Sequence, residues 1–263
     1  MGIVATGKVA DKFNDLINKV HIPFKNTGKS YEHCIKADAL RIQDYFLESI
    51  AEYKKAISFD KDNFDAYRGL GFTYKALDMS EKMVESFEIA KKLSPFDKEI
   101  YVELGMGYLK TGEIALAMSC FRTLIKLDPD FTEAWFQLAM SHELLNENEM
   151  AIDIYNKIIL QKDTHLGAYN NLGSLYMRLG KHFEAAGLFL RAIEINPQFS
   201  RAFLGLAIAF DKMERVNDAI RYYKKYLEMK PNSANTIYII ERLEALRTEK
   251  RPSSRSHLKL VSF

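Results

Sequence analysis

The stretch GAYNNLGSLYMRLG, from Gly167 to Gly180, contains three glycines and two adjacent asparagines. Taken alone, it is compatible with a glycine-rich loop that holds a phosphate and equally with an ordinary helix. Its companions elsewhere in the chain decide between the two, because similar stretches recur every 34 residues. They are YRGLGFTY from Tyr67, YVELGMGY from Tyr101, WFQLAMSH from Trp135, YNNLGSLY from Tyr169 and FLGLAIAF from Phe203.

A second set of positions repeats in step with the first. Aromatic residues recur at Phe87, Phe121, Tyr155, Phe189 and Tyr223, and turn residues at Pro95, Pro129, Asp163, Pro197 and Pro231. Within the quoted stretch, Tyr169, Leu172 and Tyr176 follow helical spacing and share one face. Each 34-residue unit is therefore predicted to be a pair of helices. One pair cannot bury its apolar face alone, so the pairs must stack.

This pattern of W-x-x-L-G-x-x-Y, then A-x-x-x-F, then P, resembles the tetratricopeptide repeat. The resemblance covers residues 30–233 and implies an all-α superhelical solenoid of antiparallel helix pairs. The expected repeats span residues 30–63, 64–97, 98–131, 132–165, 166–199 and 200–233. The first is the weakest, because His33 and Lys36 stand where an aromatic residue and a leucine are expected.

Two of the three glycines in the quoted stretch receive a structural role from this pattern. Gly173 lies on the packing face, where its missing side chain lets the second helix approach closely. The second helix carries the small Ala185 at the position expected to face it. Gly180 is expected in the turn between the two helices. No role follows from the pattern for Gly167.

The two ends of the chain are expected to flank the repeats. Residues 1–29 are predicted to form an amphipathic helix and a loop, with Val9, Phe13, Leu16, Ile17 and Val20 on one helical face. This helix either caps the first repeat or folds into a groove, its own or a partner's. Residues 234–249 are predicted to be a capping helix that packs through Ile237, Ile240 and Leu243 or Leu246. Residues 250–263 form a basic tail, expected to be flexible.

Composition narrows the functional classes. The 263 residues carry a formal net charge of +2, which gives no general indication of nucleic-acid binding. Two cysteines without metal spacing favour a reducing, cytoplasmic location. The sequence shows no apolar run long enough to span a membrane. The first residues fit a myristoylation pattern through Gly2, so any membrane association is expected to be peripheral.

The resemblance also implies where a ligand binds, because the first helices of tetratricopeptide repeats line a concave, peptide-binding groove. Asn170, Asn171 and Ser174 are expected to face this groove, where amides can hold the backbone of an extended peptide. An apolar strip in the middle of the groove suits an amphipathic helix, unless neighbouring repeats or the N-terminal helix cover it. The strip consists of Phe72, Val102, Met106, Phe136 and Met140. The asparagines could equally belong to a solvated helix face. The candidate groove residues are Arg68, Phe72, Val102, Met106, Phe136, Gln137, Met140, Asn170, Asn171, Ser174, Arg178 and Arg201.

We find no motif for catalysis, a cofactor or a metal in the sequence. His142 occupies a tyrosine position of the repeat and is expected to be packed rather than to act as a base. The sequence therefore predicts a non-catalytic scaffold or adaptor that binds a peptide or helix of a partner protein. One alternative is self-assembly, with the N-terminal helix of one copy docked in the groove of the next. Another is an association with RNA through the basic tail.

Overall fold

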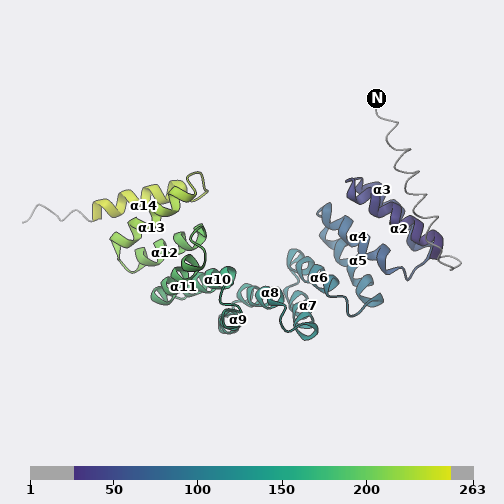
Figure 1. Ribbon diagram of the computed structural model, residues 1–263, viewed down its shortest axis with the longest axis horizontal. Helices are drawn as coiled ribbons and strands as arrows, with labels where there is room; N and C mark the ends of the chain where they lie inside the picture. Colours follow the sequence, from purple (N-terminus) through teal and green to yellow (C-terminus); the bar gives the residue numbers. More distant parts are fainter. Residues whose placement is uncertain (1–26, 250–263) are drawn as a thin grey trace, which may run out of the picture. The chain divides into compact units, whose positions relative to one another are not determined.

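The computed structural model describes residues 27–249, and in this part of the chain it contains thirteen helices and no strand (Figure 1). The amphipathic stretch from Val9 to Val20, the Gly2 pattern and the basic tail at 250–263 lie outside the described residues. The helices are α2 (Thr27–Ile42), α3 (Phe46–Phe59), α4 (Phe64–Ala76), α5 (Ser80–Leu93), α6 (Lys98–Thr111), α7 (Ile114–Leu127), α8 (Thr132–Leu144), α9 (Asn148–Gln161), α10 (Leu166–Arg178), α11 (His182–Ile195), α12 (Ser200–Lys212), α13 (Val216–Met229) and α14 (Thr236–Glu249).

The helix starts follow the 34-residue period of the sequence. From α4 onward the first helices begin at Phe64, Lys98, Thr132, Leu166 and Ser200, and the second helices begin at Phe46, Ser80, Ile114, Asn148, His182 and Val216. The all-α architecture of helix pairs is thus confirmed, and the quoted stretch lies in α10 and the turn after it. The repeat boundaries themselves remain a prediction.

The chain forms two compact units, which divide after Ala134. In the N-terminal unit, α2 packs on α3, α4 on α5 and α6 on α7, while α3 also packs on α4 and α5 on α6. In the C-terminal unit, α10 packs on α11 and α12 on α13, α9 contacts α10, α11 contacts α12, and α14 packs on α13. The second helices α3, α5 and α11 therefore each contact the first helix of their own pair and that of the next pair.

The aromatic position of each second helix is the centre of this packing. Phe189 of α11 is only 1% exposed. A Cβ built at Gly173 of α10 would lie 2.8 Å from the Cε1 of Phe189, and one built at Gly205 of α12 would lie 2.5 Å from its Cζ. The ring thus occupies the space that two glycines leave open. Ala185 is buried as expected, but Phe189, not Ala185, supplies the atoms nearest to Gly173. At most 1% of each residue is exposed at the six equivalent positions, Tyr53, Phe87, Phe121, Tyr155, Phe189 and Tyr223.

The turns within the helix pairs also repeat. One residue in each has a positive φ, between 55° and 86°, and these residues are Asp44, Asp78, Gly112, Asn146, Gly180 and Glu214. Gly180, with a φ of 74°, is therefore confirmed as a turn residue. Glycine adopts this conformation without steric cost, and asparagine and aspartate tolerate it better than most other residues do.

The C-terminal helix α14 packs through a face that matches only part of the one that the sequence predicts. Ile239, Leu243 and Leu246 are buried, whereas Ile237 is 73% and Ile240 46% exposed. The buried face also includes Arg242, whose guanidinium pairs with Asp211 of α12 at 2.7 Å. A search for apolar spacing alone passes over this face because a charged residue interrupts it, although the aliphatic stem of an arginine packs well.

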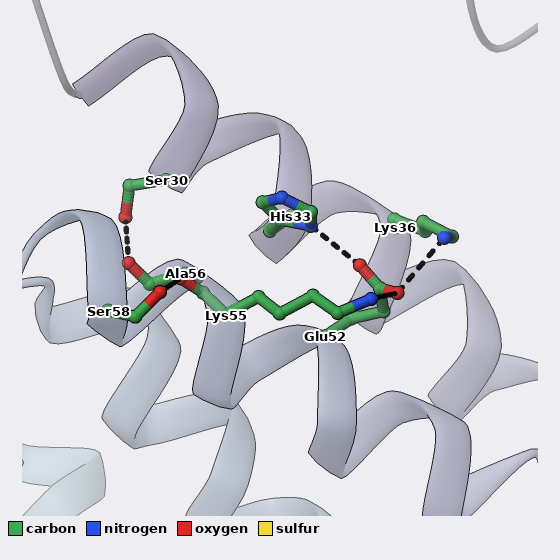
Figure 2. Close-up of polar contacts among 7 residues, drawn as sticks. All are labelled: Ser30, His33, Lys36, Glu52, Lys55, Ala56 and Ser58. Carbon is green, nitrogen blue, oxygen red and sulfur yellow. Dashed lines mark hydrogen bonds and ion pairs between the residues drawn. The ribbon is translucent and has the colours of Figure 1, made fainter.

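The first hairpin is held partly by polar contacts, which explains why α2 forms despite its poor match to the repeat (Figure 2). His33 Nδ1 lies 2.6 Å and Lys36 Nζ 3.0 Å from the carboxylate of Glu52 on α3. Lys55 donates to the same carboxylate, and the hydroxyl of Ser30 donates to the carbonyl of Ala56. The two residues that depart from the repeat pattern therefore bind one buried acid.

We predict opposite effects of alanine at two glycines of the C-terminal unit. Gly173→Ala would force the buried ring of Phe189 to move, so the free energy of unfolding should fall by about 1–3 kcal/mol. Gly187→Ala is the control, because a Cβ at this exposed position of α11 meets nothing within 4 Å. Its higher helix propensity should raise stability by up to about 1 kcal/mol. Denaturant titration of both variants tests this, and equal effects would contradict the packing described.

The observed face of α14 makes a second prediction. Leu243→Ala should lower the free energy of unfolding by about 2–5 kcal/mol, because it leaves a cavity under the helix. Ile237→Ala should change it by less than about 0.5 kcal/mol, because that side chain is mostly in solvent. Thermal and denaturant unfolding of the two variants distinguish the observed face from the one predicted from sequence, which would require a large loss from Ile237→Ala.

A third prediction concerns the stability of the fold at low pH. Burial raises the pKa of Glu52, but hydrogen bonds from Lys55, His33 and Lys36 outweigh it and hold the pKa at about 2. A depressed pKa stabilises the fold above the unfolded value of about 4.3, and this stability is lost as the pH falls toward 2. Glu52→Gln should therefore cost stability at pH 7 and progressively less below pH 4. Glu48→Gln, at an exposed site on α3, is the control. A Glu52 pKa near 4.3 by NMR titration would refute the prediction.

Candidate ligand-binding face

The candidate residues all lie on first helices, and the two units hold separate groups of them. The N-terminal unit contains Arg68 and Phe72 on α4 and Val102 and Met106 on α6. The C-terminal unit contains Phe136, Gln137 and Met140 on α8, Asn170, Asn171, Ser174 and Arg178 on α10, and Arg201 on α12.

In the N-terminal unit, most of the candidate side chains already have protein partners. Arg68 lies 3.4 Å from Asp65 and 3.8 Å from Glu99, and its guanidinium stacks over a phenylalanine ring. Phe72 packs edge-on against Phe87, with ring centroids 5.2 Å apart. Val102 is half-buried, and Met106 is 39% exposed. Met106 is thus the apolar candidate most available to a ligand in this unit.

In the C-terminal unit, a chain of hydrogen bonds connects α8, α9 and α10. The buried hydroxyl of Tyr155 on α9 donates to Glu143 on α8 at 2.6 Å. Arg178 of α10 pairs with the same carboxylate. The side-chain amide of Asn171 donates to the Tyr155 hydroxyl at 3.4 Å, and that of Asn170 donates to Asn171 at 3.2 Å. Burial, together with the hydrogen bond to Glu143, raises the pKa of Tyr155, so its hydroxyl stays protonated as a donor.

This network gives the two adjacent asparagines different roles. Asn171 uses its amide oxygen toward Asn170 and an N–H toward Tyr155, so it is held in place by the protein. Asn170 is half-buried, and among the described residues its amide oxygen accepts no hydrogen bond. Ser174, one turn further along α10, is also half-buried, and its hydroxyl has no partner in the described part of the chain. Asn170 and Ser174 therefore present polar groups that a ligand can satisfy.

Phe136 explains the glycine that the sequence leaves unassigned. Its ring lies 5.9 Å from that of Tyr155 and 5.1 Å from that of His165, measured between centroids. A Cβ at Gly167 would come within 3.0 Å of the Phe136 ring. Gly167 therefore makes room for Phe136, and this predicted groove residue also supports the start of α10.

The remaining candidates of the C-terminal unit differ in exposure. Gln137 and Met140 are half-buried on α8, and Arg201 is exposed on α12. His142 is 4% exposed and lies 2.5 Å from Glu147, so its predicted role as a packed residue is confirmed.

Sequence reasoning missed the part that Tyr155 plays. The available signal was a tyrosine at an aromatic position that is phenylalanine in three other repeats, since a buried hydroxyl requires a partner. The pattern recurs at the other two tyrosines of this position. Tyr53 donates to Asp38 at 2.7 Å and Tyr223 to Asp211 at 3.1 Å. Each acid also pairs with an arginine, respectively Arg41 and Arg242.

Other kinds of site were also sought. In residues 27–249, no cluster of histidine, cysteine, aspartate and glutamate is arranged to hold a metal ion. None of the helices described there combines the length and apolarity needed to cross a bilayer. An open hollow of about 600 Å³ lies on α12 and α13, lined by Phe203, Arg221, Tyr222 and Lys224 among others. It is separate from the candidate residues on α8 and α10.

Comparison with known proteins supports the helix-pair fold described above. A relative, the type IV pilus assembly protein PilF of Pseudomonas aeruginosa, is 26% identical over 137 residues, which is 51% of this chain and 54% of PilF. The peroxisomal targeting signal receptor of Saccharomyces cerevisiae is 28% identical over 127 residues, 48% of this chain but only 20% of the receptor. The matches thus span about half of one relative and a fifth of the other. The crystal structure of MamA is 25% identical, with a TM-score of 0.57, and covers 63% of this chain and 97% of MamA.

Family models match four segments along the chain. A TPR repeat model matches residues 37–78, and tetratricopeptide repeat models match residues 102–165, 167–199 and 200–233. These segments contain most of the positions from which the 34-residue period was read, whereas Phe87, Pro95 and Tyr101 lie between the first two segments. The chain belongs to the tetratricopeptide repeat family.

Proposed function

We propose that the protein is a non-catalytic scaffold that binds an extended segment of a partner protein on the α8–α10 face of its C-terminal unit. The observation that carries this proposal is the difference in hydrogen bonding between the side-chain amides of Asn170 and Asn171. Asn171 is fixed by Tyr155, and it in turn orients an asparagine whose amide oxygen has no partner among the described residues. An oriented amide that can donate and accept suits the backbone of a peptide.

The neighbouring side chains favour a peptide over a small metabolite. Ser174 follows Asn170 by one turn, and Arg178 follows Ser174 by another, so the three form a row along α10. The Arg178 side chain is 55% exposed although it pairs with Glu143. A row of polar groups along a helix suits an extended chain, whereas a small ligand needs an enclosed pocket.

We infer a cytoplasmic location from the cysteine count, because two cysteines provide no disulfide framework. Cys34 and Cys120 are both free and buried. Burial raises the pKa of Cys34 to about 12 and that of Cys120 to about 11, so neither is reactive at neutral pH.

A library of random peptides displayed on phage supplies a probe for the proposed face. Peptides selected against the full chain should lose affinity about 3- to 10-fold on Asn170→Ala, the equivalent of one or more hydrogen bonds. Asn156→Ala, at an exposed site on α9, is the control. Isothermal titration calorimetry measures both. Selected peptides that bind Asn170→Ala as tightly as the unchanged protein would contradict the proposal.

The positioning role of Tyr155 has a matched control within the chain. Tyr155→Phe restores the residue found at Phe87, Phe121 and Phe189, so the ring packing should survive while Asn171 loses its hydroxyl partner. Tyr223→Phe makes the same change two repeats further along the chain, beside Asp211. Both variants should lose similar stability, and only Tyr155→Phe should weaken the selected peptides. If both variants bind the selected peptides with equal affinity, Tyr155 does not position the peptide-binding site.

A further inference from the structure

The side of α2 that faces away from the rest of its hairpin carries an unexpected stripe of apolar residues. Tyr31 is 47% and Ile42 75% exposed, and Ile35 between them is half-buried. Their spacing of four and seven residues places all three on one side of the helix. We call this surface the α2 stripe.

The repeat register shows that the α2 stripe departs from the other first helices. The positions equivalent to Tyr31 hold Asp65, Glu99, Glu133, Gly167 and Arg201, and those equivalent to Ile42 hold Ala76, Lys110, Leu144, Arg178 and Lys212. Charged residues predominate in both sets. In the register, Tyr31, Ile35 and Ile42 correspond to Arg201, Asn171 and Arg178, which are candidate ligand-binding residues. The stripe therefore lies on the proposed ligand-binding side of its helix.

The side of α2 that would meet a preceding helix is polar. Glu32 is exposed, although its five equivalents, Ala66, Ile100, Ala134, Ala168 and Ala202, are each at most 1% exposed. Lys36 is exposed as well, where its equivalents are buried leucines. A polar outer face is what a terminal repeat needs when nothing stacks on it. The apolar stripe is thus not the surface of a missing repeat.

We propose that residues 9–20 of the same chain dock along the α2 stripe. These residues immediately precede α2, and their apolar members follow spacings of four, seven, eight and eleven residues from Val9. As a helix the segment is about 18 Å long, and Tyr31 and Ile42 are separated by about 16 Å along the α2 axis, at ~1.5 Å per residue. Residues 21–26, which include Pro23, supply the connection for an antiparallel return.

Charge also favours this occupant. Between residues 1 and 26 there are four lysines and two aspartates, a net charge of +2. The described part of the N-terminal unit, residues 27–134, holds 15 basic and 19 acidic residues, a net charge of −4. A basic amphipathic segment and an acidic unit attract each other, and their covalent connection raises the effective concentration of the pair.

Hydrogen–deuterium exchange on the full chain tests the docking. Backbone amides of residues 9–20 should exchange at least about tenfold more slowly than the unprotected rate. Ile42→Asp should abolish this protection, because it places a charge in the stripe. Leu47→Asp should leave it intact, since Leu47 is equally exposed, at 71%, but lies on α3 outside the stripe. Phe13→Asp should act as Ile42→Asp does.

Two results would overturn the proposal. One is that the amides of residues 9–20 exchange at the unprotected rate in the unchanged protein, or that Ile42→Asp protects them as strongly as the unchanged protein does. The other is protection that increases between about 2 and 100 μM protein, because that would assign the segment to a second copy. Neither result affects peptide binding by Asn170, which lies in the other unit.

Discussion

The structure depends on one recurring contact, a buried aromatic ring of a second helix set into the space left by missing side chains on first helices. Phe189 makes it twice, against Gly173 of its own pair and Gly205 of the next. Because the ring touches both, it sets how closely successive pairs stack. The same position is almost fully buried in every pair of the described chain. Stacking is therefore not an addition to stable hairpins but the way in which each hairpin buries its core.

The proposed site arises from a variation on that contact. Where the ring is tyrosine, its hydroxyl reaches the end of the preceding first helix and binds an acid there. At Tyr155 this acid is Glu143, and the hydroxyl also accepts from Asn171. A packing residue thereby fixes the orientation of side chains on the ligand-binding side. In the proposed function, this coupling provides a specific site without a pocket, because rigid polar groups in a row along a helix suit an extended chain better than a compact molecule.

The fold was predictable from the sequence because its signal is repeated. Helix starts, the aromatic position and the turn residues each occur several times, so a departure such as His33 does not hide the period. The face of α14 was predicted only in part, correctly at Leu243 but wrongly at Ile237, because α14 occurs once and its packing surface includes Arg242, which apolar spacing excludes. The distinct roles of Asn170 and Asn171 were also beyond the sequence. They depend on which amide reaches a hydroxyl on another helix, and spacing along α10 places both on the same side.

A structure of the full chain bound to a library-selected peptide tests the central claim most directly. The account predicts a peptide extended along α10, with its main chain hydrogen-bonded to the side-chain amide of Asn170 and with Asn171 still bound to Tyr155. A peptide bound instead in the hollow of α12 and α13, beside Arg221 and Lys224, would contradict it.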